Sequence, residues 1–344
     1  AKSGGCEGAL DTAPLPTPPV GAPPLTVLQI VPTLEAGAAA SNVVDIVRIL
    51  TGAGHRAIVV SRSGRRAGEV SRYGGEWVPL DVASINPAVM LANIPRLVRI
   101  IRARGCDLVH AHGRAGAWSA FLAARITRRP LVTTWYKGFR EQNLLKHLYN
   151  GVMAWGDRVV AVSDQLADLV SERYGTPPER LRVVPASIDT ARFDPAAVSR
   201  DRIEAVRRAW GLGERTKVLL VAGRLLPRKG HHVVVEAARR LKGLGLKDFA
   251  CVFASEHAET RYAGELWDLV LATDVADVVR LAGPVEDVLA AYAAATVVVS
   301  AAVQHEGMQR AILEAQAMAR PVIVSDLGAG AELVLAPPAV GEDR

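Results

Sequence analysis

Short apolar runs alternate with longer segments of helical periodicity along most of the chain, and this alternation constrains the fold more than any other feature. "TVLQIVP" (26–32) and "RAIVVS" (56–61) are apolar runs bounded by turn residues, which is typical of buried strands. Between them, "NVVDIVRILTGAGH" (42–55) repeats apolar residues at helical spacing and stops at glycine. Strands that alternate with helices favour a parallel sheet covered on both faces.

The alternation is interrupted once and then restarts. Residues 180–195, "RLRVVPASIDTARFDP", contain two prolines and break the rhythm, so we interpret them as a linker. We predict an α/β protein of two doubly wound, Rossmann-like domains that face each other across a cleft. The expected division is a flexible Pro-rich lead-in over 1–24, an N-terminal domain with its linker over 25–195, and a C-terminal domain over 196–344. Ligands of such sheets bind beyond the carboxyl ends of the strands.

Composition excludes a few broad classes. Half of the 344 residues are hydrophobic, so the chain can bury real cores. The lead-in lacks a basic stretch followed by an apolar one, and we expect no secretory leader. The longest apolar run, 288–303, is interrupted by Tyr292, Thr296 and Ser300, which argues against a membrane span. The net charge of +6 suits an anionic substrate or a membrane surface, although a general preference for arginine explains it equally well.

Three cysteines, Cys6, Cys106 and Cys251, are far apart and lack the spacing of metal ligands or redox pairs. They indicate reduced thiols and a cytoplasmic protein. We expect no nucleic-acid partner.

Two glutamates, Glu306 and Glu314, lie in the stretch "HEGMQRAILEAQAMARPVIVSD" (305–326). Eight residues of one helix would separate them by about 12 Å along the axis and by about 80° around it, so they would not meet over one small atom. If Glu306 instead precedes the helix, the backbone N–H groups of Gly307, Met308 and Gln309 form an anion site. A nucleoside diphosphate sugar fits this arrangement, with hexose hydroxyls on Glu306 and ribose hydroxyls on Glu314. The alternative is a pair of solvated helix glutamates.

A basic loop, "GRLLPRKG", follows the expected strand 217–223 and contains Gly223, Arg224 and Lys229. An arginine and a lysine at the carboxyl end of a strand can neutralise a diphosphate leaving group without a metal. The loop is not a Walker motif, because Lys229 is followed by glycine. By itself it also fits a solvated basic turn.

The chain resembles the group 1, retaining glycosyltransferases of the GT-B fold, the family with two glutamates separated by seven residues. The resemblance covers roughly Thr26 to Ala331 and rests on "GRLLPRKG", "EGMQRAILE", "RPVIVSD", "DLVHAH" and "VVAVSDQLADLV". It implies transfer of a hexose, with retention and without a cofactor, from a nucleoside diphosphate sugar to a hydroxyl of a glycan or lipid-linked acceptor. The acceptor class would be cell-envelope polysaccharide or lipopolysaccharide. The resemblance assigns the donor diphosphate to Arg224 and Lys229, the transferred sugar to Glu306 and the amides after it, and the ribose to Glu314. Glu306 is thereby a candidate catalytic residue.

Several departures from the family pattern matter. The usual Gly-Gly loop after the first strand keeps Gly37 but has alanine at 38, and Tyr136, followed by Lys137, replaces a histidine that touches the donor sugar. The chain also stops before the family's last helix, so we expect a truncated or divergent C-terminus. Two alternatives follow: a nucleotide-sugar epimerase on the same fold, and a non-catalytic relative that binds sugar nucleotides. A dehydrogenase is disfavoured because no G-x-G-x-x-G follows a strand.

His110 and His112 project to the same side of their strand, since side chains alternate with period two. We expect His112 to reach the cleft as a catalytic residue and His110 to be buried and hydrogen-bonded. No third ligand at matching spacing supports a metal, so we expect none. The arginines at 96, 99 and 102 line an apolar helical stripe, which fits either an anionic membrane surface, here the inner face of the membrane, or an ordinary solvated helix face.

Overall fold

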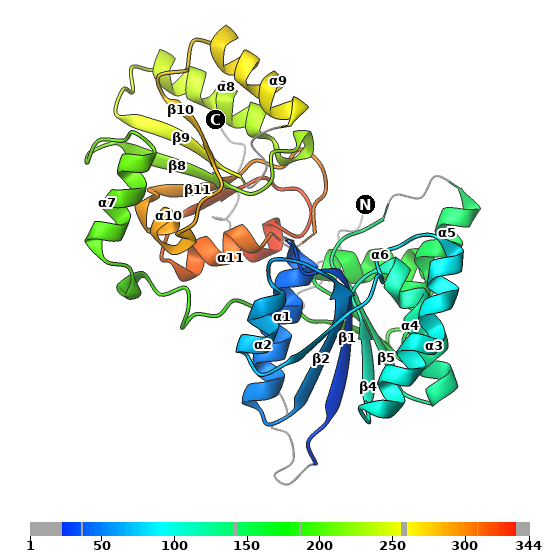
Figure 1. Cartoon of the computed structure of the whole chain (residues 1–344). Coiled ribbons are helices and arrows are strands. Elements are labelled where there is room, and N and C mark those ends of the chain that lie inside the picture. Colours follow the sequence, from blue (N-terminus) through cyan, green and yellow to red (C-terminus); the bar gives the residue numbers. More distant parts are fainter. Residues whose placement is uncertain are drawn as a thin grey trace.

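The computed structural model describes residues 23–35, 37–139, 143–185, 187–255, 260–307 and 309–334. These residues form two parallel β-sheets, one after the other along the chain, and helices cover both sheets (Figure 1). The predicted α/β class with two doubly wound domains is therefore confirmed.

The N-terminal domain is built on a seven-stranded sheet in the order β3-β2-β1-β4-β5-β6-β7, with all neighbours parallel. Leu28, Ile30 and Val31 of the interior strand β1 are completely buried. A strand buried on both faces has a continuous apolar sequence, which is why the pattern located it. The strands are β1 (Thr26–Thr33), β2 (Arg56–Arg62), β3 (Glu76–Pro79), β4 (Leu108–Ala111), β5 (Leu131–Trp135), β6 (Arg158–Ala161) and β7 (Leu181–Val183).

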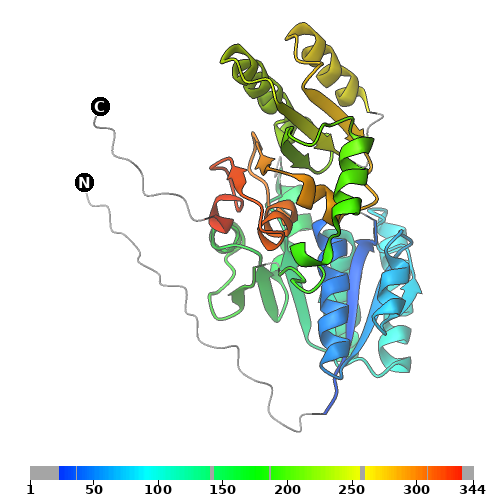
Figure 2. The ribbon, with the colours of Figure 1, turned by 90° about the vertical axis from the view of Figure 1, so that its left-hand side faces the viewer.

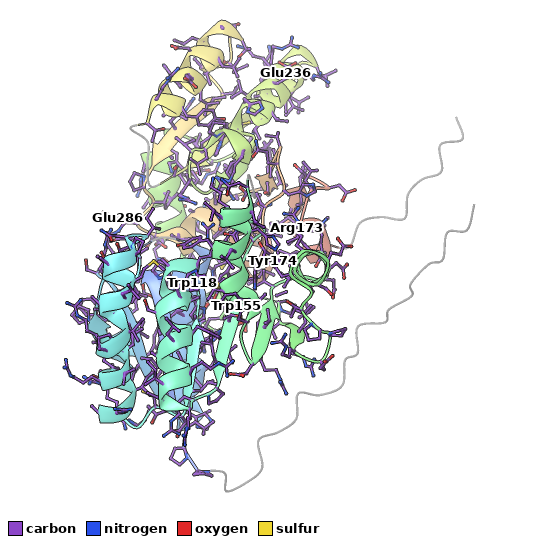
Figure 3. All side chains as sticks on the ribbon, turned by 90° about the vertical axis from the view of Figure 1, so that its right-hand side faces the viewer. Trp118, Trp155, Arg173, Tyr174, Glu236 and Glu286 are labelled. Atoms are coloured by element: carbon purple, nitrogen blue, oxygen red, sulfur yellow. The ribbon has the colours of Figure 1, made fainter. Side chains whose placement is uncertain are left out.

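Helices form a layer on each face of this sheet. In Figure 1, α1 and α2 lie on one side of the sheet and α3, α4 and α5 on the other. Two separate buried clusters match these layers, one including Val43 and Val70 and the other including Leu97. Trp118 of α4 and Trp155 after α5 pack edge to face, with ring centroids 5.1 Å apart (Figure 3). The helices are α1 (Ala38–Gly52), α2 (Ala67–Arg72), α3 (Pro87–Ala103), α4 (Arg114–Thr127), α5 (Leu144–Gly151) and α6 (Asp164–Tyr174).

The C-terminal domain is built on a five-stranded parallel sheet in the order β10-β9-β8-β11-β12. It also has two buried clusters, one against α8 and α9 and one against α10 and α11. The strands are β8 (Lys217–Ala222), β9 (Phe249–Ala254), β10 (Val279–Gly283), β11 (Val297–Ser300) and β12 (Val322–Val324). The helices are α7 (Arg200–Ala209), α8 (His231–Gly243), α9 (Arg261–Ala272), α10 (Val288–Ala294) and α11 (Arg310–Ala317).

Each sheet reverses its strand order once, and these reversals position the loops of interest. The N-terminal sheet reverses between β1 and β4, and the C-terminal sheet between β8 and β11. Loops at the carboxyl ends of these strands are the usual ligand-binding places of such sheets. Helix α11 of the C-terminal domain lies beside α1 of the N-terminal domain (Figure 1). Figure 2 shows the two domains after a turn of 90°.

The structure adds elements that the sequence pattern did not indicate. Strand β3 and helix α2 were not predicted, because they are short and carry few apolar residues. The predicted linker begins with strand β7, which pairs with β6 through Val159 and Leu181. The apolar run 288–303 is divided between α10 and β11. None of the helices in the described ranges combines the length and apolar content needed to cross a bilayer.

Candidate functional site

The loop that contains Glu306 lies directly against the N-terminal domain. A Cβ atom added to Gly307 would be 1.6 Å from the carbonyl oxygen of Tyr136 and 3.1 Å from Cβ of Lys137. No side chain fits there, so the approach of the two loops requires glycine. The structure thereby brings together three residues that the sequence predicted from distant motifs: Glu306, Tyr136 and Lys137.

Glu306 is held by two cations of its own domain. Its side chain is 8% exposed, and one carboxylate oxygen is 2.8 Å from Nε of Arg228 while the other pairs with Nζ of Lys229. The backbone of Glu306 also forms a parallel bridge with Gly328. Arg228 was not predicted as a site residue, although its place directly before Lys229 in the basic loop was a signal. The carboxylate is therefore already engaged by the cations that a diphosphate would use.

The basic loop is fixed against strand β11. Lys229 ends a 3-10 turn (Pro227–Lys229), and Gly230 follows with φ 72°, where an added Cβ would be 1.7 Å from the carbonyl oxygen of Ala301. Gly223 opens the loop with φ 142°, a conformation that side chains rarely adopt. Arg224 is exposed, and among the described residues no carboxylate lies within ion-pair range of it. The loop therefore leaves one guanidinium free for an anionic ligand.

Helix α11 begins later than the sequence predicted. Its first residue is Arg310, and Gln309 is the N-cap without a side-chain capping bond. The predicted donor amides of Gly307 and Gln309 therefore precede the first turn, because the bridge of Glu306 and the contact of Gly307 with Tyr136 hold this segment out of helix. Met308, also predicted to bind the donor, lies outside the described residues.

The side chain of Gln309 points into the C-terminal domain. It is 7% exposed, and its Oε1 is hydrogen-bonded to the hydroxyl of Ser300. Its Nε2 is buried and has no hydrogen-bond partner among the described residues. Only the backbone of Gln309 therefore remains available for an anion.

Glu314 lies one turn into α11 and accepts a hydrogen bond of 2.8 Å from the hydroxyl of Tyr292. Burial, with the nearby carboxylate of Glu314, raises the pKa of Tyr292 well above its ordinary value, so this hydroxyl stays a donor. The other oxygen of Glu314 is 3.5 Å from Nε of Arg310. Arg310 donates instead to Asp45 of α1, 2.7 Å away, and both side chains are largely buried, with 14% and 13% exposure. Neither Arg310 nor Asp45 was predicted, because an interdomain ion pair has no sequence spacing.

His112 lies deeper than the sequence suggested. Its side chain is 4% exposed, Nε2 is 2.5 Å from Oε1 of Gln29, and Nδ1 is 2.7 Å from the hydroxyl of Tyr136. The same hydroxyl accepts from Nδ2 of Asn42 at 2.8 Å. Both ring nitrogens of His112 are engaged, so an influence of this ring on a ligand would pass through Tyr136, and its catalytic role stays a prediction.

Burial keeps this cluster uncharged. It lowers the pKa of His112 well below its ordinary value, with a further contribution from the neighbouring His110, and it raises the pKa of Tyr136. His110 is hydrogen-bonded as expected, with Nε2 2.7 Å from the hydroxyl of Thr134, but it is half-buried rather than buried; desolvation lowers its pKa to about 3. At neutral pH the histidines are therefore neutral hydrogen-bonding groups.

Gly37 is the N-cap of α1 and has φ 138°, which favours glycine. An added Cβ at Gly37 would find no atom within 4 Å, so the space above it is open. This position follows β1 at the reversal of the N-terminal sheet, where the predicted donor contact would need close approach of a ligand to the backbone.

Two further features lie elsewhere. Among the described residues no group of three histidine, cysteine, aspartate or glutamate side chains could hold a metal ion. A surface groove of about 710 Å³ runs between α3 and α4 and is lined by Ile94, Pro95, Val98, Arg99, Arg102, Ala103 and Ile126. It holds two of the three arginines of the predicted stripe, away from Glu306.

Comparison with protein families matches both halves of the chain. Residues 39–192 match the model for Glycosyltransferase Family 4, and residues 216–338 match the model for Glycosyl transferases group 1. The D-inositol 3-phosphate glycosyltransferase of Salinispora arenicola is 29% identical in an alignment that covers 85% of this chain and 66% of that protein. For the protein of the same name from Actinosynnema mirum, identity is 31% over 64% of this chain and 56% of that protein. The chain thus spans less than two thirds of the length of these relatives.

Solved structures agree with the fold. A glycosyltransferase from Rickettsia africae superposes with a TM-score of 0.80 at 26% identity, covering 90% of this chain and 81% of that one. HepE from Anabaena, solved with UDP and glucose, gives a TM-score of 0.76 at 20% identity over 91% and 83% of the two chains, a likeness of fold. The two halves of the chain are thus similar to a family 4 glycosyltransferase domain and to a group 1 glycosyl transferase domain, and their fold is that of the GT-B glycosyltransferases.

Proposed function

We propose that the protein transfers a hexose from a nucleoside diphosphate sugar to a hydroxyl of a glycan or lipid-linked acceptor of the cell envelope, with retention at the anomeric carbon. One observation carries the proposal. Glu306 and Glu314 lie on either side of the start of α11, and the basic loop with Arg228 and Lys229 contacts the first of them. Two carboxylates and a basic loop thus lie close together at the domain boundary, which supports binding of a sugar nucleotide there.

The donor would lie along that segment. We assign its diphosphate to Arg224, Lys229 and the backbone N–H groups of Gly307 and Gln309, because cations and free amides are the natural partners of phosphate. The ribose hydroxyls would donate to Glu314, whose remaining acceptor positions are not used by Tyr292.

The transferred sugar would lie on Glu306, between the two domains. Its hydroxyls would take over from the cations that now pair with the carboxylate, while those cations turn to the diphosphate. Tyr136 and Lys137 would contact the sugar from the N-terminal side, with His112 fixing the orientation of the Tyr136 hydroxyl. Gly37 and Gly223, both at conformations that favour glycine, would let the backbone approach the donor.

The basic loop can also replace a metal. Positive charge close to the bridging oxygen stabilises the diphosphate as it leaves, and Arg224, Arg228 and Lys229 supply this charge. We therefore propose activity without a divalent cation or another cofactor. Turnover should persist after exhaustive chelation, and activity that magnesium or manganese alone restores would contradict this.

The first experiment is a thermal-shift screen with uridine, guanosine and adenosine diphosphates, followed by transfer assays with sugars of the base that binds. A bound ligand raises the melting temperature by mass action. Arg224→Ala and Lys229→Ala should each weaken the selected diphosphate by about 1.5–3 kcal/mol, the range for a hydrogen bond to a charged group. Unchanged affinity in both variants would remove the loop from the site. D-inositol 3-phosphate, after which the Salinispora and Actinosynnema relatives are named, is the first acceptor to test.

A non-catalytic relative that binds sugar nucleotides is the second candidate. It is favoured by the engaged state of Glu306 and by the replacement of the family histidine with Tyr136, whose hydroxyl is hydrogen-bonded inside the N-terminal domain. Donor binding in calorimetry without transfer or hydrolysis, over a broad set of acceptors, would favour this candidate. Release of an epimerised monosaccharide without any acceptor would instead favour an epimerase.

A lipid-linked acceptor would bring the protein to the inner face of a membrane, and we propose a peripheral contact there from the cytoplasm. The groove between α3 and α4 supports this contact, because its apolar lining is bordered by Arg99 and Arg102 and neither has a carboxylate within ion-pair range among the described residues. Sedimentation with vesicles of phosphatidylcholine, with and without phosphatidylglycerol, tests it. Binding that does not depend on the anionic lipid would contradict the assignment.

A further inference from the structure

Gln29 is a polar residue in the buried part of strand β1, between the apolar residues Leu28 and Ile30. Its side chain is completely buried, and its Nε2 group has no hydrogen-bond partner among the described residues. Burial of an amide N–H group without a partner destabilises a fold, so a glutamine at this place calls for an explanation. The other end of its amide group supplies one, because Oε1 is 2.5 Å from Nε2 of His112.

Gln29 is the first member of a hydrogen-bonded chain of side chains that leads from the interior of the sheet to the domain boundary. His112 directly follows β4, and Tyr136 directly follows β5. Nδ1 of His112 is 2.7 Å from the hydroxyl of Tyr136, and Nδ2 of Asn42, on α1, is 2.8 Å from the same oxygen. Tyr136 is half-buried, and its backbone carbonyl oxygen meets Gly307 of the other domain. The chain therefore ends where we place the transferred sugar.

The direction of each hydrogen bond follows from the first contact of this chain. Oε1 of Gln29 carries no hydrogen, so Nε2 of His112 donates to it. A neutral imidazole has one N–H group, and burial keeps His112 neutral because it lowers the pKa of the ring well below its ordinary value. Nδ1 is therefore the acceptor, and the hydroxyl of Tyr136 donates its single hydrogen to it.

The hydroxyl of Tyr136 then has one position left for a ligand. Its oxygen can accept two hydrogen bonds, and one of them comes from Asn42. The hydroxyl stays protonated, because burial raises its pKa and the opposing effects of Asn42 and of the positive charge of Arg310 are smaller. The remaining position accepts a hydrogen bond and cannot donate one. An ether or carbonyl oxygen of a ligand would find no donor there, whereas a hydroxyl group would find a partner.

We propose that Gln29 is a positioning residue that acts through His112 to make Tyr136 a hydrogen-bond acceptor, and so selects a transferred sugar with a free hydroxyl at that place. This inference rests on the proposed function, because it assumes that the transferred sugar lies against Tyr136. With an apolar residue at position 29, His112 would carry its hydrogen on Nδ1 and donate it to Tyr136. The hydroxyl of Tyr136 would then turn its own hydrogen toward the ligand, and the selection would be lost.

Gln29→Met tests the positioning in the full chain without any ligand. Methionine is about as long as glutamine and removes both buried polar atoms, so the fold should persist. NMR of the ring nitrogens in histidine labelled with nitrogen-15 shows which nitrogen of His112 carries the hydrogen, and His112→Asn identifies its signals. We expect the hydrogen on Nε2 in the native chain and on Nδ1 in Gln29→Met. A native ring with the hydrogen on Nδ1, or a ring that Gln29→Met leaves unchanged, would overturn the proposal.

Sugar nucleotides in which one sugar hydroxyl at a time is replaced by fluorine test the selection, since fluorine donates no hydrogen bond. Calorimetry measures their affinities, because fluorine also affects the chemical step. The native chain should bind one of these analogues about five- to tenfold more weakly than the parent compound, and Gln29→Met should bind the two about equally.

Thr133→Val is the matched control for the affinities. Its hydroxyl is also buried on β5, but it bonds the carbonyl oxygen of Met153 and takes no part in the chain from Gln29 to Tyr136. This variant should keep the native preference for the hydroxyl. An equal preference in Gln29→Met and Thr133→Val would overturn the selection by Gln29. If no sugar nucleotide binds at all, the proposed function fails, whereas the ring nitrogens of His112 still decide whether Gln29 positions Tyr136.

Discussion

Replacing Glu306 with glutamine should strengthen binding of the bare nucleoside diphosphate and weaken sugar transfer. The carboxylate is 2.8 Å from Nε of Arg228 and pairs with Lys229, so a diphosphate must share these cations with a negative neighbour. Glutamine keeps the size of the side chain and removes the charge. The cations then become free for phosphate, while the acceptor that we assign to the sugar hydroxyls becomes weaker.

The size of the effect follows from the charges and their exposure. Two like unit charges about 6 Å apart repel by about 3 kcal/mol at an effective dielectric constant near 20. Arg228 and Lys229 are 32% and 22% exposed, so water screens part of this repulsion. We expect a gain of about 1 kcal/mol, which is roughly fivefold in affinity for the nucleoside diphosphate. Loss of one charge-assisted hydrogen bond in the transition state should lower kcat about ten- to a hundredfold.

Calorimetry with the bare nucleotide and steady-state kinetics with the full donor measure the two effects separately. Glu236→Gln is a matched control, because Glu236 also pairs with two cations, Arg239 and Arg240, but does so on α8 (Figure 3). The control should change neither quantity. A fivefold loss of nucleotide affinity in Glu306→Gln would refute the reasoning, since it would mean that the carboxylate helps the cations to bind phosphate.

Three further changes test the arrangement of the domains and the buried groups. Gly307→Ala should abolish transfer, because the added methyl collides with the Tyr136 loop. Gly243→Ala, where an added Cβ meets no atom within 4 Å, should leave the activity unchanged. Equal transfer rates of the two variants would contradict the close contact. Asp45→Asn should open the domains and weaken the affinity for the nucleoside diphosphate, since Arg310 then pairs with Glu314 alone. Small-angle scattering should show a larger radius of gyration. An unchanged radius together with unchanged affinity would show that this ion pair does not hold the domains closed. Burial, then repulsion from a neighbouring lysine, lowers the pKa of His231 to about 4. The unfolded chain therefore binds a proton at this histidine before the folded chain does. The free energy of unfolding should fall as pH drops below about 6.5, by about 1.4 kcal/mol per pH unit for this one group. Urea unfolding midpoints from pH 7.5 to 5 measure this loss of stability. If His231→Asn does not reduce the change of the midpoint with pH, this histidine is not its source.

Much of the fold could be predicted because strands buried on both faces leave continuous apolar runs. Strand β1, with Leu28, Ile30 and Val31 completely buried, is such a case. Strands β3 and β7 lie at the edges of the sheet and keep exposed or half-exposed residues, so no apolar run marked them. Edge strands are stabilised by pairing with a neighbour, which a local pattern does not record.

The candidate site could be predicted only where the residues that form it are close together in the sequence. Glycines and charged residues in "GRLLPRKG" and "EGMQRAILE" stand at short spacing, and the structure does bring Lys229 to Glu306. Asp45 and Arg310 are separated by 265 residues, so only the packing of one domain on the other could reveal their contact. The strand position of His112 likewise did not reveal its partners Gln29 and Tyr136, because they come from two other strands or their ends.

The segment from Glu306 to Glu314 has a shape that would let two carboxylates eight residues apart serve the one ligand that we propose. Glu306 is in the extended part that contacts the N-terminal domain, and Glu314 is in the helix behind it. Arg310 lies between them and pairs with both Asp45 of the other domain, at 2.7 Å, and Glu314, at 3.5 Å. When the domains part, Asp45 leaves and Glu314 becomes the nearest partner, which would occupy the carboxylate that we assign to the ribose. Contact with Asp45 would therefore loosen the hold of Arg310 on Glu314 while Gly307 brings Glu306 against Tyr136. Nucleotide binding and domain closure would then favour each other through one arginine.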